Sequence, residues 1–523
     1  MKKENSARGD RLIKNSVLNL VNQTIALVAS FATSVIVARI LKPENYGIFN
    51  MTLWLSGLFS WIISLGLIQA VTKYVAEYRG KKQDANVNTV VLFVMKIEIG
   101  VSILFTALLV FFSTPIADYF FSENESFYFA LAFMGLLPGI LTAVFSATID
   151  GLQKFEYFTK YTIITTPIAF AAKIGALYAG YKINGLLAVN LLFSVVNTLF
   201  FWHVLKKEGI RLFAGINPEE GTVRKKIISY NWTVSAIQLT AKVVWDKSEN
   251  FFLGRYCSAV QLGYYNLAFN VAQRFMTLLP STFWRVLFPA MSEYFGSGDK
   301  EKISRLFYLS SRYIAFVSFP VGIAGIVLSY PIINYMYGAE YLGSKYALQI
   351  FFFSMMITSL SKPGSAILYG MEKQSFILKY SAVLAVVNIA LSLLLIPKYG
   401  ALGAAVSYSI VTMAGSVGGL IYTCSRVSLI YPFKSIFKIM MSSIIMGIVM
   451  TMIVKQEAEL LGFILSIPAG IAVYFISSTL WGTFEEEDYT LLKSLKKIFP
   501  GKWGKYVDDT VSFVASFKDG TRK

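Results

Sequence analysis

The apolar positions of this chain form long uninterrupted runs, separated by short segments rich in polar and charged residues. Most runs contain about 20 residues, the length of α-helix needed to cross the hydrocarbon core of a bilayer. They are about twice as long as a membrane β-strand and lack the alternation that a barrel requires. The pattern therefore predicts an all-α integral membrane protein.

Fourteen transmembrane helices are predicted. Their approximate ranges are 15–38, 46–68, 88–112, 127–149, 159–180, 184–203, 229–253, 263–288, 306–328, 347–369, 376–396, 401–424, 436–454 and 460–481. No loop between them is long enough to fold as a separate catalytic domain. This argues against an enzyme such as a membrane glycosyltransferase or glycan polymerase.

Short anchors along the chain indicate an internal duplication. Arg39 and Gly47 recur 216 residues later, with the same spacing, as Arg255 and Gly263. Membrane proteins built from two similar halves are typically transporters with the substrate site between the halves. Because each half holds six spans, an even number, both halves begin on the same side of the membrane and the repeats are parallel.

The domain organisation follows from this repeat. We expect an N-lobe at 1–227, a C-lobe at 228–424, two accessory spans at 425–482, and a basic amphipathic cytoplasmic tail at 483–523. The tail carries "YTLLKSLKKIF", which is apolar on one helical face and rich in lysine on the other. Such a helix is expected to lie along the inner membrane surface.

The distribution of charged residues predicts how the protein is oriented in the membrane. Hydrophobic residues make up 55% of the chain and charged residues 15%, with a mean hydropathy of +0.57. The net charge of +18 comes from Lys and Arg in alternate loops, so the positive-inside rule places both termini in the cytoplasm and the protein in the cytoplasmic membrane. No compact basic domain is present to bind nucleic acid. Anionic membrane lipids are the expected partners of these loops.

The sequence indicates no cofactor and no metal site. The chain has two cysteines, Cys257 and Cys424, without metal-ligand spacing, and one histidine, His203, without a partner for proton relay. Candidate chemistry must therefore come from ionisable and amide side chains inside the spans, where such residues are costly and mark functional sites.

Span seven carries the richest set of these residues. Gln238, Lys242, Asp246 and Glu249 are spaced four, four and three apart, which places them on one face of a continuous helix. Span eight carries Asn270 and Arg274, four residues apart. Further candidates are Asn19 and Gln23 in span one, Lys96 and Glu98 in span three, and Lys173 in span five.

A structural role is the alternative for each charge. Lys242 and Asp246 have the spacing of an intrahelical ion pair. For Lys96 and Glu98, one base and one acid, the alternative is pairing with partners on neighbouring helices. Arg285 and Arg312, nearer the cytoplasmic ends, are placed to extend their side chains to the interface.

An excess of cations inside the membrane predicts an anionic ligand such as phosphate or pyrophosphate. We assign pyrophosphate binding to Lys242, Arg274 and Lys173, and sugar contacts to the amides of Gln238, Asn19, Gln23 and Asn270. Asp246, Glu249 and Glu98 are candidates for binding H⁺ or Na⁺, and the sequence does not decide between these ions. The repeated Arg39, Gly47, Arg255 and Gly263 fit a packing hinge, with a role in an outer gate as the alternative.

Several motifs resemble one known family. "LKPENYGIFN", "LGYYNLAF", "LFPAMSEYFGSGDKEKISRLF", "PIINYMYGAEYLGSKYALQIF" and "GMEKQSF" look like those of the polysaccharide-transport flippases. These are the Wzx-like, O-antigen-flippase branch of the multidrug/oligosaccharidyl-lipid/polysaccharide exporter superfamily. The resemblance implies two six-helix bundles in a V, with Lys242, Asp246 and Arg274 on the helices that line the cavity. It also implies a substrate carried as a polyprenyl- or dolichyl-pyrophosphate-linked oligosaccharide.

The expected function is a flippase that moves this lipid-linked glycan from the inner to the outer leaflet by alternating access, for cell-surface polysaccharide or glycan biosynthesis. Glycosyltransferases or a glycan polymerase are the expected partner proteins. Two alternatives stay open: a cation-coupled multidrug exporter of the same fold, and a polytopic glycan polymerase. Span one, which lacks Asp and Glu, argues against the exporter.

Overall fold

The structure, a computed structural model, describes residues 2–121, 125–210, 220–276, 294, 299–371, 374–427, 429–456, 459–485 and 488. Over these residues the chain is helical, without a β-strand, which confirms the all-α prediction. Eight of the described helices are long and apolar enough to cross a membrane. Two of them, Val28–Ser64 and Ser375–Val427, each extend over two predicted spans. This arrangement is compatible with fourteen spans, a count that stays a prediction.

The chain divides into two compact units, Met1–Leu267 with Ile377–Ser407, and Ala268–Phe376 with Tyr408–Lys523. The division differs from the predicted lobe boundaries at 227 and 424, because residues 220–267 and part of a later helix pack with the first unit. The predicted lobes stay a prediction.

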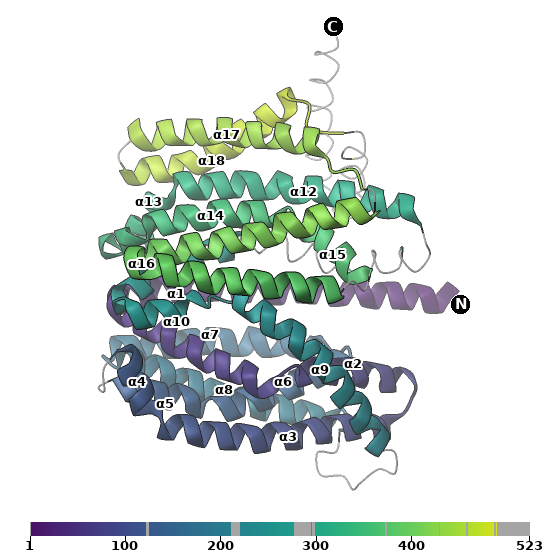
Figure 1. Cartoon of the computed structure of the whole chain (residues 1–523). Coiled ribbons are helices and arrows are strands. Elements are labelled where there is room, and N and C mark those ends of the chain that lie inside the picture. The colour runs from purple at the N-terminus through teal and green to yellow at the C-terminus, as the bar shows by residue number, and fades with distance from the viewer. Residues whose placement is uncertain are drawn as a thin grey trace. The chain divides into compact units, whose positions relative to one another are not determined.

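The first unit is a bundle of helices (Figure 1). Its helices are α1 (Lys2–Ser64), α2 (Leu67–Gly80), α3 (Asp84–Phe111), α4 (Ser113–Phe120), α5 (Ser126–Met134), α6 (Leu136–Gly151), α7 (Glu156–Tyr178), α8 (Lys182–Lys207), α9 (Glu220–Trp245) and α10 (Glu249–Tyr256). A further helical stretch covers 259–276 and belongs to this unit as far as Leu267. The first part of α16 (Gln374–Val427) completes the unit. Valines on α2, α3 and α6, among them Val75, Val90 and Val144, are fully buried in its core.

Breaks within the long helices occur where the backbone chemistry favours them. In α1, Lys42 has φ 65° and ψ 167°, and it precedes Pro43, which disfavours helical geometry at the residue before it. Between α1 and α2, Gly66 has φ 84°. In α16, Gly400 has φ 55°, a left-handed value that glycine adopts without steric cost. The breaks at Lys42 and Gly400 lie between two predicted spans, whereas Gly66 lies within the predicted span 46–68.

The second unit contains α12 (Lys300–Val327), α14 (Lys345–Ser359), α15 (Lys362–Gly370), α17 (Phe433–Gln456), α18 (Glu459–Leu480) and the second part of α16. A short helix, Ser329–Pro331, a π-helical turn, Ile332–Tyr337, and a 3₁₀ turn, Ala339–Ser344, connect α12 to α14. Helices α17 and α18 run side by side, and α17 packs along α12 (Figure 1). Asp299 caps α12 by accepting a hydrogen bond from the backbone N–H of Lys302 at 3.1 Å.

Candidate functional site

The predicted polar face of span seven is divided by a break in the helix. Helix α9 ends at Trp245, Lys247 has φ 53°, and α10 begins at Glu249. The continuous helix that we expected over 229–253 is therefore wrong. Because a positive φ ends the helical repeat, Glu249 does not continue the face formed by Gln238, Lys242 and Asp246. Polar spacing alone did not show this, although Ser248, a residue type favoured directly before a helix, is a local signal that a new helix begins at Glu249.

Gln238 and Lys242 lie on α9, and Asp246 directly follows its last residue, Trp245. Lys242 forms an ion pair with Asp246. The Lys242 side chain is about a quarter exposed and the Asp246 side chain less than half exposed, at 23% and 42%. Two tryptophans of α1 lie against this face. Trp61 donates to Gln238 Oε1 at 3.3 Å and its ring lies 5.8 Å from Lys242 Nζ, while Trp54 donates to the Asp246 carbonyl at 3.1 Å.

This arrangement supports the intrahelical pairing that the spacing of Lys242 and Asp246 predicted. The lysine is half-buried next to an aromatic ring that attracts cations. A phosphate that binds Lys242 would compete with the carboxylate of Asp246 and share the indole N–H and amide donors around it.

Glu249 lies in a separate, fully buried polar cluster of the first unit. Its Oε1 accepts from Asn388 Nδ2 at 2.8 Å, and its Oε2 accepts from the Tyr265 hydroxyl at 3.0 Å. Next to it, Asn266 Nδ2 donates to Asn250 Oδ1 at 2.9 Å. Lys247 Nζ donates to Asn266 Oδ1 at 3.4 Å. Glu249 therefore belongs to a buried network of carboxylate, hydroxyl and amide groups.

The cluster combines residues that the sequence analysis noted and residues that it missed. Asn388, a single amide in the apolar span eleven, and Tyr265 were not candidates, although a lone amide in an apolar run is a recognisable signal. Carboxylate and amide oxygens can hold a proton or a hard monovalent cation. Among the residues described, no group of three or more His, Cys, Asp and Glu side chains gathers as a metal site.

The repeated glycines lie where the two repeats touch. A Cβ atom at Gly47 would overlap the carbonyl oxygen of Ala259, and a Cβ atom at Gly263 would overlap that of Pro43. Gly47 and Gly263 are equivalent positions of the repeat, and so are Pro43 and Ala259. The duplicated segments therefore cross at matching positions with backbone against backbone, which only glycine permits.

The repeated arginines have less in common than the glycines. Arg255, in the last turn of α10, donates to the Tyr119 carbonyl at 3.4 Å and lies 4.6 Å from the centre of its ring. Arg39 lies on α1, exposed, three residues before the break at Lys42. The roles of both arginines in a hinge or gate stay a prediction.

Lys173 faces a pocket within the first unit, apart from the α9 residues. The pocket has a volume of about 370 Å³ and lies among α6, α7 and α8. Its lining includes Asn190 and Asn197 as well as Lys173. Lys173 therefore lies in a polar pocket separate from Lys242 and Asp246, with amide and hydroxyl groups lining the pocket beside its ammonium group.

Glu98 of α3 is fully buried, and the Ser64 hydroxyl is the polar group beside its carboxylate. Lys96 is exposed, and no ion pair with Glu98 is present in the part of the chain that the structure describes. Helical residues two apart point to different sides, so the two side chains do not face each other. Partners on neighbouring helices, the alternative that the sequence analysis gave for both residues, stay a prediction.

In the second unit, Arg274 and Asn270 lie on the helical stretch 259–276, both half-buried. Arg274 Nη1 is buried without a hydrogen-bond partner among the described residues. Lys362, at the first position of α15, is an exposed cation inside predicted span ten that the sequence analysis missed. Asn19 and Gln23 lie on α1, but their side chains fall outside the described part, as does Arg285.

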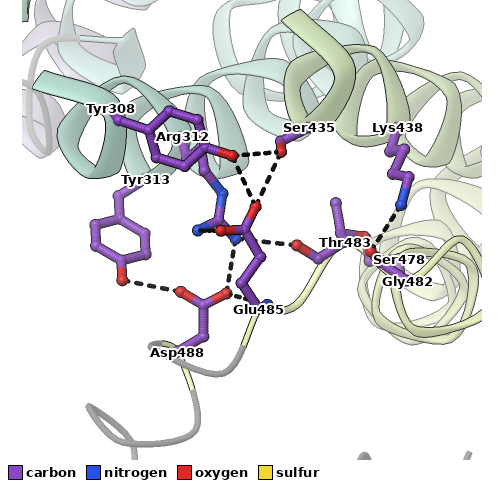
Figure 2. A network of polar contacts seen from close by, with 10 residues as sticks. All are labelled: Tyr308, Arg312, Tyr313, Ser435, Lys438, Ser478, Gly482, Thr483, Glu485 and Asp488. Atoms are coloured by element: carbon purple, nitrogen blue, oxygen red, sulfur yellow. Dashed lines mark hydrogen bonds and ion pairs between the residues drawn. The ribbon is translucent and has the colours of Figure 1, made fainter. Parts of the chain in front are cut away.

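Arg312 is not an interfacial side chain, contrary to our expectation. Its side chain is 4% exposed and pairs with Glu485 at 3.0 Å and Asp488 at 2.7 Å. Figure 2 shows this network, in which Tyr308 donates to Glu485 and Tyr313 donates to Asp488. The carboxylates come from the segment after α18, too distant in sequence for pattern reasoning to connect with α12.

Taken together, the helical bundles, the apolar spans and the cationic and amide side chains within them define a multi-pass membrane transporter. The sequence model of a family described as "Polysaccharide biosynthesis protein" matches residues 36–346. The chain belongs to this family, and with it to the polysaccharide-transport branch of the multidrug/oligosaccharidyl-lipid/polysaccharide exporter superfamily. The resemblance that its motifs suggested is thereby confirmed.

Individual proteins agree with this assignment. A Shigella flexneri protein named "Putative O-antigen transporter" is 25% identical over 411 residues, covering 76% of this chain and 94% of that protein. A solved structure of the lipid II flippase MurJ, in an inward closed conformation, matches with a TM-score of 0.65 and 18% identity, over 87% of this chain and 98% of that one. An inward-facing multidrug transporter of the MATE family matches with a TM-score of 0.58 and 15% identity, over 79% and 94%. The two solved structures show that the fold is shared.

Proposed function

We propose that this protein is a flippase that moves a polyprenyl- or dolichyl-pyrophosphate-linked oligosaccharide from the inner to the outer leaflet by alternating access. The family assignment supports a role in polysaccharide biosynthesis, and the O-antigen transporter and MurJ are named for related transport. The observation that carries the substrate class is Arg274, whose Nη1 is buried without a partner in the described residues. A buried guanidinium needs a counter-charge, and a phosphate oxygen supplies one.

Pyrophosphate binding in this proposal falls to Arg274 and Lys242, with Lys173 as a further substrate contact. Arg274 supplies a planar donor fork and Lys242 a point charge. Gln238, Asn270, Asn19 and Gln23 are the proposed contacts of the sugar hydroxyls. An inside-negative potential favours outward movement of the anion by about 2.3 kcal/mol per charge per 100 mV.

Ion coupling is assigned to the buried acids. Glu249 is the strongest candidate, because its carboxylate is fully buried and receives hydrogen bonds only from neutral groups among the described residues. A charge in such a place requires a proton or a bound cation for neutrality. H⁺ and Na⁺ are both consistent with these oxygens, and Asp246 and Glu98 are the other candidates.

Reconstituted transport of a fluorescent polyprenyl-pyrophosphate disaccharide tests the proposal. Arg274→Gln and Lys242→Gln are expected to slow its movement at least tenfold, because each removes a charge-assisted hydrogen bond worth about 1.5–3 kcal/mol. Arg79→Gln, in an exposed ion pair with Asp84, is the control. Unchanged transport in both variants, with normal membrane insertion, would show that the site is assigned wrongly.

One observation favours the alternative function of a cation-coupled multidrug exporter. That mechanism typically uses a membrane-buried acid in the first lobe, and Glu98 is fully buried in the first unit. Uptake of an organic cation by the same vesicles, lost in Glu98→Gln but retained in Arg274→Gln, would establish this function instead. The flippase proposal predicts no such uptake.

A further inference from the structure

The pocket around Lys173 has the composition of a carbohydrate site. Besides the lysine it is lined by two amides, Asn190 and Asn197, two hydroxyl groups, Thr142 and Ser194, and one aromatic ring, Phe193. Amides and hydroxyls match sugar hydroxyl groups, which both donate and accept hydrogen bonds, and an aromatic ring offers a flat apolar surface. Its volume of about 370 Å³ is at the small end of ligand pockets, so it suits one sugar ring rather than a whole oligosaccharide.

The pocket carries one positive charge that the described protein does not neutralise. No acidic residue lines it, and Lys173 has no ion pair or hydrogen bond among the described residues. One ammonium group matches one carboxylate. A pyrophosphate would bring more negative charge than a single lysine can balance, and planar bidentate recognition would favour arginine.

The walls of the pocket are held in place while its binding groups remain available. Thr142 and Thr198 lie 2.9 Å apart, and Thr198 also donates to the Pro138 carbonyl at 2.7 Å, so α6 and α8 are tied together beneath the pocket. Asn197 Oδ1, in contrast, is buried with no hydrogen-bond partner in the part of the chain described. A buried amide oxygen without a donor loses free energy that a ligand hydroxyl would restore.

We propose that this pocket binds one acidic sugar of the transported glycan, with its carboxylate on Lys173 and its hydroxyl groups on Asn190 and Asn197. The inference rests on the proposed flippase function and adds to it the class of glycan: an oligosaccharide that contains a uronic acid or a similar carboxylated sugar. Lys173 then selects the substrate, whereas Arg274 and Lys242 bind the pyrophosphate common to all such substrates.

Two probes that differ in one group test the inference. They are polyprenyl-pyrophosphate-linked disaccharides ending either in glucose or in glucuronic acid, added to vesicles that contain the purified full-length protein. Wild type is expected to move the acidic probe about tenfold faster, the equivalent of one charge-assisted hydrogen bond. In Lys173→Gln the ratio of the two transport rates is expected to fall to about one, because only the acidic probe is slowed. Lys173→Arg is expected to keep a preference for the acidic probe.

Lys182→Gln is the matched control, because Lys182 begins α8 as an exposed residue and does not line the pocket. It should leave the ratio unchanged. Equal slowing of both probes by Lys173→Gln would show that Lys173 binds the shared pyrophosphate. An equal transport rate for both probes in wild type would show that the pocket does not prefer the carboxylated sugar. Either result overturns the inference and leaves the flippase function standing.

A binding measurement separates failure of the pocket from failure of the function. If wild type moves neither probe, the flippase proposal fails, and thermal unfolding with methyl glucuronide or methyl glucoside then decides about the pocket. If only the glucuronide stabilises the protein, and this effect is lost in Lys173→Gln, the result supports binding of an acidic sugar in the pocket. If neither sugar stabilises the protein selectively, the inference is overturned. Stabilisation instead by phosphatidylglycerol vesicles, lost in the same variant, would assign the pocket to a lipid headgroup and also overturn the inference.

Discussion

Arg312 shows how strongly one charge inside a membrane protein depends on its partners. Its guanidinium is buried against the carboxylates of Glu485 and Asp488 and the carbonyl of Thr483 (Figure 2). The two carboxylates also receive hydrogen bonds from Tyr308, Tyr313 and Ser435. The network attaches the segment after α18 to α12 and α17, so it orders the start of the C-terminal region.

Removing this cation is expected to be costly. Arg312→Met leaves two carboxylates without their cation, and breaking a buried pair costs about 3–5 kcal/mol. We therefore expect a clearly lower thermal unfolding temperature of the purified protein. Lys438→Met is the control, since Lys438 is half-buried and among the described residues forms no ion pair, donating only to the Gly482 carbonyl at 3.0 Å. If Arg312→Met unfolded at the wild-type temperature, the network would be no more than a surface contact.

Glu208 is a second residue whose charge state matters. Although burial alone raises its pKa, hydrogen bonds from Tyr157 and Lys154 outweigh this effect and hold the pKa below its ordinary value. Tyr157 donates at 2.6 Å and Lys154 lies at 3.2 Å. These contacts join the end of α8 to the start of α7 outside the predicted spans.

A lowered pKa in the folded state predicts loss of stability in acid. The contribution of Glu208 is present above the unfolded-state pKa and disappears as the pH falls through the folded-state value. An unperturbed glutamate has a pKa of about 4.3. Between pH 6 and pH 3 the unfolding temperature of wild type should therefore drop more steeply than that of Glu208→Gln. If the unfolding temperatures of the two proteins fell in parallel with pH, the contacts of Glu208 with Tyr157 and Lys154 would contribute nothing to stability.

At the scale of elements, the crossing of the duplicated segments at Gly47 and Gly263 connects sequence to packing. The repeat preserved glycine at both positions, and the backbones there approach too closely for a side chain. A contact of this kind can join or separate as a unit when the segments move, which is consistent with the predicted hinge. The close backbone contact explains why the glycines are the same in both repeats, whereas the charged residues of the two halves differ.

Substitution at the crossing tests this role. Gly47→Ala should force the segments apart and destabilise the protein by about 1–3 kcal/mol, the usual effect of overpacking. Gly57→Ala, on the same helix with open space around it, should be neutral or stabilising because alanine favours the helix. The comparison uses thermal unfolding and cysteine accessibility near residue 43. Equal behaviour of the two variants would contradict a close crossing.

The helix break at Lys247 changed how the site is understood. The periodicity of polar residues located Lys242 and Asp246 correctly as neighbours, since they lie one helical turn apart. It joined Glu249 to the same face because spacing takes no account of Ser248, whose residue type is favoured directly before a new helix. The partners of Glu249, namely Tyr265 and Asn388, come from other helices, so only packing could reveal them.

At the scale of the whole molecule, the distribution of Lys and Arg predicts the topology. Basic residues concentrate in alternate loops and at both ends of the chain, and such bias sets orientation through the positive-inside rule. We propose accordingly that both termini face the cytoplasm.

Reporter fusions test this topology. A fluorescent protein that matures only in the cytoplasm should be active when fused to either terminus, and alkaline phosphatase, which is active only outside, should be inactive there. Phosphatase placed after Asp118, before the acidic segment that continues to Glu125, should be active. The reverse pattern at either terminus would rule out an even number of spans or the assumed orientation.

The sequence by itself determined the all-α membrane class, the duplication and the family, because these depend on apolar run length, spacing and short motifs that are local or periodic along the chain. It also located Lys242 and Asp246 as a pair. Only the tertiary structure decided that Glu249 and Arg312 are buried in polar networks, that Lys173 faces its own pocket, and that the repeated glycines touch. These properties arise from contacts between residues far apart in sequence, whose free energies depend on burial and hydrogen-bond partners that no local pattern encodes.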